Sequence, residues 1–442
     1  MAEAFSDQRR IESETIRKVG IRLVPFLVVC YFIAYVDRVN VGFAALTMNK
    51  DLGLSATAFG TGAALFFVAY VIFEVPSNLA LERFGARRWI ARIMISWGLV
   101  GLGSAFVTGA VTFSIARFLL GAAEAGFFPG VILYLTYWFP KAYRARIVAM
   151  FMVAIPVSSF LGSPLSASLL TLDGVGGLRG WQWLLICESI PALLLGLATL
   201  VVLPSKPAEA QFLTSEQKAW LEGCLEAERR AASAGHSGHG SVWSVLTNKQ
   251  VWLLAVIYSG SSATSNALSL WMPQILKSFG LSNLETGLLN MIPFGIASVF
   301  MIFWGLRADK SGERIWSTAL PLALTSLSLA LTLLTGSLAL TLVLLSLVLL
   351  GNYSIKGPFF ALVTETLSPA QAAAGIAAIN TLAHLGTGAI TSLIGVLREQ
   401  SGSFPVALLP LCVLTAVGCA LVFWIGRDRM RASAAVAPAP AR

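Results

Sequence analysis

Two pairs of charged residues stand inside long apolar stretches of the sequence. Asp37 and Arg38 lie in the first such stretch, and Arg117 and Glu124 lie in the fourth. A charge near the middle of a bilayer costs roughly 2.5–3.5 kcal/mol or more, so it marks a functional site by default. A buried carboxyl is suited to reversible protonation, and a guanidinium offers a fork of N–H donors to an anion. These residue types predict a site that handles protons and anions together.

The spacing of these residues predicts their depth. Arg117 and Glu124 are seven residues apart and therefore share one helix face. Counted from the outer end of its stretch, Glu124 lies about 18 Å deep, near the membrane midplane, and Arg117 about 7 Å deep. Asp37 is expected in the outer part of the membrane at a depth like that of Arg117, which allows the two to pair. The alternatives are that Asp37 and Arg38 form an ion pair at the outer surface, or that Glu124 is only a structural partner of an arginine.

The composition shows what must position these residues. Of 442 residues, 56% are hydrophobic and 12% are charged, about half the charge of a soluble protein. The apolar residues form blocks of about twenty, the length that crosses a bilayer as a helix. We expect an all-α integral membrane protein with twelve transmembrane helices. The expected spans are 21–45, 57–79, 89–108, 112–137, 147–170, 182–203, 251–276, 285–306, 315–335, 338–363, 371–397 and 404–426.

The basic residues predict the orientation. Of the 31 Lys and Arg residues, 24 fall on one side of this arrangement and four fall in the loops of the other side. The 24 include Arg22 and Arg92, which stand at the ends of spans, and the remaining three, Arg38, Arg117 and Lys356, lie deeper within spans. This asymmetry follows the positive-inside rule and places both termini in the cytoplasm. The net charge of +9 therefore sets orientation and does not indicate a nucleic-acid partner. We expect a multi-pass protein of the bacterial inner membrane, embedded in lipid as a monomer.

The chain is expected to divide into two six-helix bundles, 1–203 and 250–428. Between them, 204–249 is a cytoplasmic linker with a charged helix at 214–230, and 429–442 is a low-complexity tail expected to be disordered. The five cysteines are scattered, and the linker histidines His236 and His239 are expected to be solvated, so no metal site is predicted.

The loops after the second span of each half share a motif. The second copy stands 227 positions after the first, and both combine an acid, basic residues and a turn glycine. The first copy comprises Glu82, Arg83, Gly85, Arg87 and Arg88, and the second comprises Gly305, Asp309, Lys310, Gly312 and Arg314. This duplication resembles the major facilitator superfamily, in which two six-helix bundles rock about a central site. The resemblance implies that this loop gates the cytoplasmic side.

Longer motifs of the first half sharpen the resemblance. The strings YVDRVNVGFAALTMNKDLGL, FEVPSNLALERFGARRWIARI and RFLLGAAEAGFFPGVILYLTYWFP are similar to the anion:cation symporter branch of that superfamily. That branch imports tartrate, phthalate, sugar acids and aromatic acids. The resemblance implies that Asp37 and Glu124 carry protons, that Arg38 binds the anion, that Arg117 is a charge partner, and that Tyr35 lines the same cavity.

The second half offers substrate-binding candidates. Asn266 lies in a polar run at 258–269, where hydroxyls and amides either bind a hydroxylated substrate or hold helices together. The resemblance implies that Asn380 contacts substrate, and His384 follows one turn later. Lys356 either snorkels to the cytoplasm or adds a second cation to the cavity, which would favour a dianion.

The expected function is a proton-coupled symporter that imports a small organic anion by alternating access, with protons as the coupling ion and no other cofactor. No nucleophile–base set appears, so the chain is not expected to be an enzyme. Two alternatives remain: a drug/proton efflux antiporter of the same fold, and a membrane nutrient sensor that does not transport. Two further acids within spans, Glu74 and Glu188, are expected to be structural.

Overall fold

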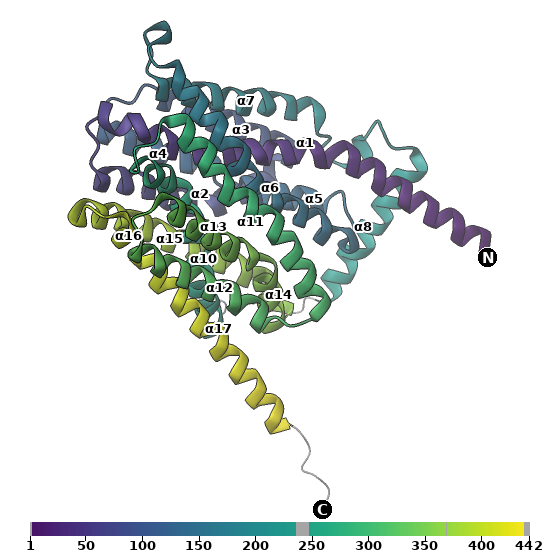
Figure 1. Cartoon of the computed structure of the whole chain (residues 1–442). Helices are drawn as coiled ribbons and strands as arrows, with labels where there is room; N and C mark the ends of the chain where they lie inside the picture. Colours follow the sequence, from purple (N-terminus) through teal and green to yellow (C-terminus); the bar gives the residue numbers. More distant parts are fainter. Residues whose placement is uncertain (1, 236–246, 368, 437–442) are drawn as a thin grey trace, which may run out of the picture. The chain divides into compact units, whose positions relative to one another are not determined.

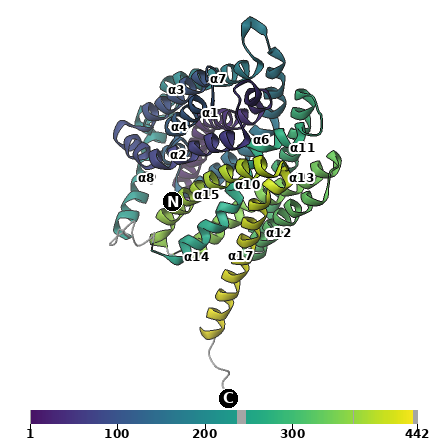
Figure 2. The same cartoon turned by 90° about the vertical axis from the view of Figure 1, so that its left-hand side faces the viewer.

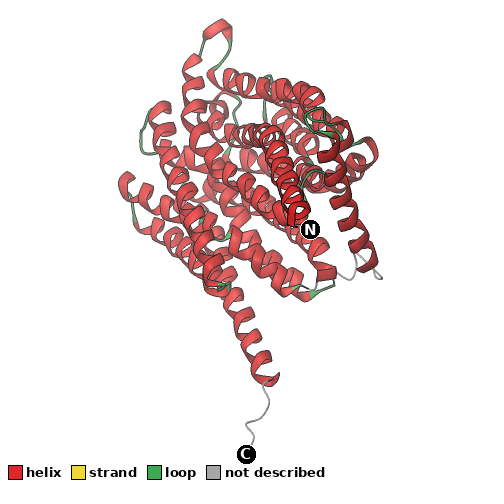
Figure 3. Cartoon of the chain, turned by 90° about the vertical axis from the view of Figure 1, so that its right-hand side faces the viewer, coloured by secondary structure: helices red, strands yellow, loops and turns green. Residues whose placement is uncertain are grey.

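The computed structural model describes residues 2–235, 247–367 and 369–436, which fold into helices joined by short loops (Figure 1). Within these ranges there is no β-strand (Figure 3). Ten helical segments of the described chain are long and apolar enough to cross a membrane. The other two expected spans also form helices. These are α3 (Ala86–Ser104), which begins with basic residues, and α10 (Lys249–Lys277), which is rich in serine. The predicted all-α membrane fold is confirmed.

The first compact unit is built from Met1–Gly53 and Leu65–His239. In it α3 packs along α7, and α1 packs against both α6 and α7; Figures 1 and 2 show α3 beside α7. Short 3₁₀ turns at Leu170–Leu172, Val175–Gly177 and Pro207–Glu209 join some of its helices. Its helices are α1 (Ala2–Asp51), most of α2 (Ala56–Phe84), α3, α4 (Ala110–Glu124), α5 (Phe127–Thr136), α6 (Lys141–Leu169), α7 (Gly180–Val202) and α8 (Ser215–Gly235).

The second compact unit is built from Leu54–Ala64 and Gly240–Arg442. Here α10 packs along α15, α11 along α13, and α12 along α17, around a core of aliphatic and aromatic side chains. A 3₁₀ turn at Thr332–Leu334 follows α12. Its helices are α10, α11 (Asn283–Ser311), α12 (Ile315–Leu331), α13 (Leu338–Ser354), α14 (Lys356–Thr366), α15 (Pro369–Ser401), α16 (Phe404–Ala407) and α17 (Leu409–Val436).

The helix faces that remain exposed are apolar and suit contact with lipid hydrocarbon. Val201, Leu334 and Val111 are the most exposed large aliphatic residues of the described chain, and many other exposed Leu, Ile and Val side chains lie on the same spans. In water such surface would be unfavourable, but it matches a hydrocarbon environment. The pattern agrees with a multi-pass membrane protein.

The helices extend beyond the predicted spans. α1 begins at Ala2 instead of near 21, and α17 continues to Val436. The prediction of disorder from 429 onward is therefore wrong for 429–436, where an alanine-rich sequence favours helix; the rest of that tail lies outside the described residues. The helix expected at 214–230 is confirmed as α8, which continues to Gly235. His236 and His239 lie outside the described residues.

The helix α8 is tied to the first unit by side-chain contacts. Lys18 Nζ of α1 donates to Gln217 Oε1 at 3.1 Å. Arg144 of α6 forms an ion pair with Glu228 at 2.9 Å. The segment expected as a linker thus contributes an ordered helix that packs on α1.

The duplicated loop motif places a glycine with positive φ after the second span of each half, although ψ differs, at 142° for Gly85 and −1° for Gly312. Gly85 follows α2 with φ 86°, and Gly312 follows α11 with φ 66°. These left-handed conformations are costly for residues with a Cβ, which explains the glycine at both positions. In the second copy Arg314 pairs with Asp309 and with Glu365, each at 3.1 Å. The turn predicted from the glycines is present; its role as a gate stays a prediction.

Candidate functional site

Helix α1 presents its two central charges to different neighbours. Asp37 is 4% exposed, and its Oδ1 accepts a hydrogen bond from Asn40 Nδ2 at 2.7 Å. Arg38, the next residue, points toward α2 and α4. Adjacent residues on a helix point about 100° apart, so one helix serves two environments. Tyr35, one turn earlier, lies on the Arg38 side.

Arg38 forms a buried ion pair with Glu124 of α4. Its Nε donates to Glu124 Oε1 at 2.6 Å, and its Nη2 lies 2.5 Å from the same oxygen. Glu124 is only 2% exposed. Hydrogen bonds between two ionised groups are short and strong, and breaking such a pair by removing one partner costs about 3–5 kcal/mol. The structure thus brings together two residues that the sequence singled out separately.

Aromatic rings surround the Arg38 guanidinium. Its Cζ lies 4.9 Å from the ring centroid of Tyr35, 5.6 Å from that of Phe66 and 5.5 Å from that of Tyr70. A cation over an aromatic face gains about 0.5–2 kcal/mol, more when it is desolvated. Phe66 and Tyr70 were not singled out from the sequence. Their spacing of one turn places both rings on the same face of α2, which could have indicated a shared role.

The expected pairing of Arg117 with Asp37 is not formed. Within the described chain no carboxylate lies within 4 Å of the Arg117 side chain, whose guanidinium lies 5.0 Å from the Phe66 ring centroid. α1 continues past the predicted span to Asp51, so Asp37 lies about 21 Å from that end of the helix. Arg38 reaches Glu124 of α4. Asp37 and Arg38 do not pair with each other, because Asp37 binds Asn40 and Arg38 binds Glu124.

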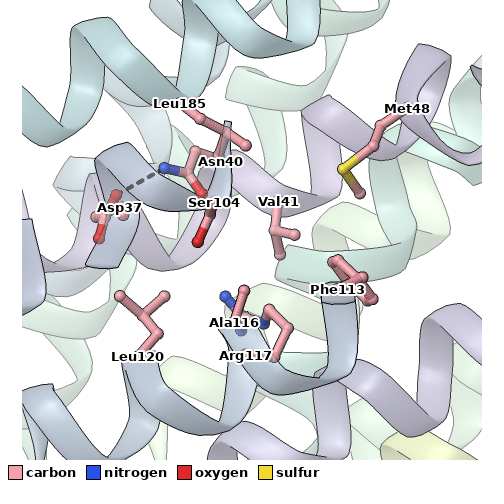
Figure 4. Close-up of a pocket in the computed structure, with 11 residues that line it drawn as sticks. Asp37, Asn40, Val41, Met48, Ser104, Phe113, Ala116, Arg117, Leu120 and Leu185 are labelled. Atoms are coloured by element: carbon pink, nitrogen blue, oxygen red, sulfur yellow. Dashed lines mark hydrogen bonds between the residues drawn. The ribbon is translucent and has the colours of Figure 1, made fainter. Parts of the chain in front are cut away.

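Asp37 and Arg117 instead face a common cavity (Figure 4). Its volume is about 20 Å³, room for about one water molecule but not for an organic substrate. Figure 4 shows Arg117 rising from α4 and Asp37 joined to Asn40 on α1. The cavity is lined by Asp37, Asn40, Val41, Met48, Gly101, Ser104, Phe113, Ala116, Arg117, Leu120 and Leu185. Most of the cavity wall is apolar, and the charged side chains that reach it are those of Asp37 and Arg117.

Glycines allow α4 to carry Glu124 close to α2. A Cβ at Gly121 would overlap the backbone carbonyl of Phe66. Directly after Glu124 the helix breaks, and Gly126 adopts φ 84° against the side chain of Ser77. The small-residue run thus permits the close helix approach that its composition predicted.

In the second unit, Lys356 is a buried cation. It is 8% exposed and begins α14, close to the end of α13. Its Nζ lies 4.4 Å from the ring centroid of Tyr353. None of the ion pairs of the described chain includes Lys356, and its ammonium lies against the face of the Tyr353 ring.

The other candidates of the second unit lie on α10 and α15. Asn266 Nδ2 donates to the carbonyl of Ser262 at 2.8 Å, and Ser262 Oγ accepts from Thr387 at 3.0 Å. Asn380 and His384 are half-buried on α15, one turn apart. Part of this hydroxyl-rich surface therefore connects helices, the alternative that the sequence left open. A missed residue, Asn352 of α13, donates to Ser265 Oγ at 2.5 Å.

Comparison with known proteins identifies the family of this chain. The family model of the Major Facilitator Superfamily matches residues 27–391. A protein of Agrobacterium vitis named "Putative tartrate transporter" is 45% identical over 96% of this chain and 93% of its own length. A "Quinolone resistance transporter" of Acinetobacter baumannii is 37% identical over 93% of this chain and 95% of its own length.

Among solved structures, a bacterial homologue of the human lysosomal transporter Spinster superposes with a TM-score of 0.75 at 13% identity, covering 92% of this chain and 96% of that one. At this identity the match shows the fold alone. The relatives confirm the resemblance to the anion:cation symporters, and membership in a transporter family confirms that the chain is not an enzyme. The chain belongs to the Major Facilitator Superfamily and is a multi-pass membrane transporter.

Proposed function

We propose that this transporter is a proton-coupled importer of small organic anions in the bacterial inner membrane, with both termini in the cytoplasm. The observation that carries the proposal is the ion pair between Arg38 and Glu124. It supplies an anion-binding guanidinium whose present partner is a carboxylate that a proton can neutralise.

In this proposal the ion pair links proton binding to anion binding. While Glu124 is ionised it occupies the donors of Arg38. A proton on Glu124 removes that charge and leaves the guanidinium buried without a counterion, which is unfavourable until a substrate carboxylate replaces Glu124. Asp37, beside the small cavity, takes a second proton, so that acids do not repel the incoming anion. Release of anion and protons into the cytoplasm restores the ion pair.

The substrate class that fits these residues is a small hydroxylated dicarboxylate. The similarity to a protein named for tartrate supports this class. Lys356 supports it too, because a buried ammonium lying against an aromatic ring is a ready partner for a second carboxylate. Tyr35, Asn266, Asn380 and His384 are the proposed contacts to the remaining polar groups of the substrate, and Arg117 adds positive charge to the same region of the first unit.

The test is uptake of radiolabelled L-tartrate into proteoliposomes by purified Glu124→Gln protein. Glutamine keeps the size and the hydrogen-bond acceptor but carries no titratable charge. Uptake driven by a pH gradient is expected to fall at least about tenfold, the equivalent of ~1.4 kcal/mol. Exchange of internal for external tartrate, which needs no net proton movement, is expected to persist.

The control is Glu222→Gln, which removes an exposed acid of α8 and should leave both activities at wild-type level. Gradient-driven uptake by Glu124→Gln at the wild-type rate would refute the proposed coupling.

A second candidate function is drug efflux by proton antiport, favoured by the similarity to a quinolone resistance transporter. Quinolones carry a carboxylate, so the same arginine could bind them. Two measurements distinguish the candidates: the direction in which the drug moves under a proton gradient, and whether tartrate inhibits that movement. Efflux predicts that an inward proton gradient drives a fluoroquinolone out of vesicles and that tartrate does not inhibit it. A sensor without transport predicts binding of tartrate with no uptake of either compound.

A further inference from the structure

A second and larger cavity lies within the second unit. It is formed where α10, α12 and α15 end and where α13, α16 and α17 begin, so its walls come from one end of the helix bundle. Its volume is about 320 Å³, against about 20 Å³ for the cavity beside Asp37. Sites for small molecules begin at about 300 Å³, so this cavity has room for a small ligand or a ligand headgroup. The distribution of basic residues predicts that this end of the unit faces outward.

Arg398 supplies the charge of this cavity. It is half-buried near the end of α15, and the other described residues that line the cavity are uncharged. No ion pair of the described chain includes Arg398. The adjacent acid, Glu399, accepts a hydrogen bond at 2.8 Å from the backbone N–H of Thr57, in the α2 segment that belongs to this unit. The guanidinium therefore faces the cavity without a carboxylate partner.

The chain holds the Arg398 guanidinium in place with an aromatic ring. Its Cζ lies 4.0 Å from the ring centroid of Phe404, and that ring packs against the buried Trp271 of α10 at 6.4 Å between centroids. Gly402, with φ 68°, turns the chain back after α15, and its N–H donates to the Arg398 carbonyl at 3.0 Å. A ring covers a face of the planar guanidinium, whereas the N–H donors point outward in its plane. These donors remain available to a ligand.

Hydroxyl groups add further donors to the cavity wall. Those of Ser278 and Thr332 donate to carbonyls of the backbone that precedes them. Thr335 Oγ1 accepts from the next loop's backbone at 3.2 Å, so its proton remains free to donate, and the side chains of Thr341 and Ser403 also line the cavity. Because the described lining contains one cation, several hydroxyls and no acid, it suits an oxyanion.

We propose that this cavity is an oxyanion-binding site of the second unit, with Arg398 as the residue that binds the charged group. The guanidinium accepts a carboxylate or a phosphate in two parallel N–H···O bonds, and the hydroxyls bind the remaining oxygens. A dissolved organic acid and the phosphate of a phospholipid share this chemistry. The apolar part of the wall, which includes Phe279, Leu345 and Leu408, is compatible with the carbon skeleton of either ligand.

The test has two arms that separate these sources. In the first arm, purified protein in detergent is titrated calorimetrically with L-tartrate and with inorganic phosphate at constant ionic strength. If the ligand is dissolved, Arg398→Gln is expected to weaken one binding event at least about tenfold, because a charged hydrogen-bond partner is lost. In the second arm, native mass spectrometry counts the phosphatidylglycerol molecules that remain bound. If the ligand is a lipid, Arg398→Gln is expected to retain one fewer.

Arg307→Gln is the matched control for both arms. Arg307 is an exposed arginine whose Cζ also lies over an aromatic ring, 5.0 Å from the centroid of Trp304, but it does not line this cavity. It should bind tartrate, phosphate and lipid as the wild type does. Thr341→Val covers the case in which Arg398→Gln does not fold. It removes a hydroxyl while nearly keeping the shape, and it should weaken binding roughly twofold to tenfold.

Unchanged binding of tartrate and phosphate by Arg398→Gln, together with an unchanged number of bound lipids, would overturn the inference. The result is independent of the proposed function, because Arg398 takes no part in the proposed transport cycle. In Arg38→Gln, proton-driven uptake should be lost while the binding that depends on Arg398 persists. If the wild type shows that binding but no proton-driven uptake, the proposed function fails and the oxyanion site stands. If the wild type is proton-driven and Arg398→Gln binds every probe normally, the reverse holds.

Discussion

At the scale of single residues, Arg38 combines three features that suit an anion-binding group in a membrane. Its planar fork donates from Nε and Nη2 to one Glu124 oxygen, and aromatic rings cover its faces. A guanidinium stays charged when it is buried and can exchange one carboxylate for another without changing its geometry. A lysine at this position would lose both the fork and the stacking.

Lys356 gives a prediction about substrate charge. Lys356→Met keeps most of the side-chain length but removes the ammonium that lies over Tyr353. Because a hydrogen bond to a charged group contributes about 1.5–3 kcal/mol, affinity for L-tartrate should fall roughly tenfold to a hundredfold. Affinity for a monocarboxylate of similar size should change little. Calorimetric titration of the purified protein measures both.

The matched control is Lys277→Met, which removes a lysine in the last turn of α10 and should bind tartrate as the wild type does. An equal loss of affinity for the monocarboxylate and for tartrate in Lys356→Met would argue for a general structural role.

At the scale of helices, one span is broken beside a functional candidate. α4 ends at Glu124 and α5 starts at Phe127, and the two residues between them, Ala125 and Gly126, have non-helical backbones. At the junction of α13 and α14 the single residue Ile355 keeps a helical backbone. Broken helices in membranes occur where the freed backbone is buried in protein or lines a cavity. The break directly after the buried Glu124 supports a role for this position in the transport site.

The close approach of α2 and α4 leads to a stability prediction. Gly121→Ala places a Cβ into the carbonyl of Phe66, so the helices must move apart at the level of Glu124. Overpacking of this kind costs about 1–3 kcal/mol, and we expect a lower thermal midpoint in detergent together with reduced tartrate transport.

Gly20→Ala is the matched control, since a Cβ at Gly20 meets no atom within 4 Å. Alanine there should be neutral or stabilising by about 0.5–1 kcal/mol, because glycine weakens a helix interior. A Gly121→Ala protein as stable and as active as Gly20→Ala would contradict the packing argument.

At the scale of the whole molecule, the distribution of basic residues predicts the orientation in the membrane. The predicted cytoplasmic segments hold 24 of 31 Lys and Arg residues, against four in the predicted external loops. Fusion of reporters to the C-terminus tests this: green fluorescent protein should fluoresce there, and alkaline phosphatase should be inactive. Fusions after residue 178, in the loop between α6 and α7, should show the reverse. Active phosphatase at the C-terminus would invert the proposed topology.

The sequence by itself determined the class of fold and the set of chemically active residues. Blocks of apolar residues long enough to cross lipid favour helix, and a charge inside such a block is costly enough to mark a candidate functional residue. For this reason Asp37, Arg38, Arg117, Glu124 and Lys356 could be found without any structure. The turn glycines Gly85 and Gly312 could be found too, because their repeated positions reflect a backbone conformation that disfavours other residues.

Only the tertiary structure decided which of these residues meet. The register between helices depends on where each helix ends and on which small residues allow close contact, and neither follows from hydropathy. The ion pair forms between Arg38 and Glu124, whereas the sequence had allowed a pairing of Asp37 with Arg117. Because Gly101 has no Cβ, Ser189 of α7 can lie close to α3. Local sequence determines the secondary structure of a segment. The contacts of its side chains depend on packing against segments that are far apart in the chain.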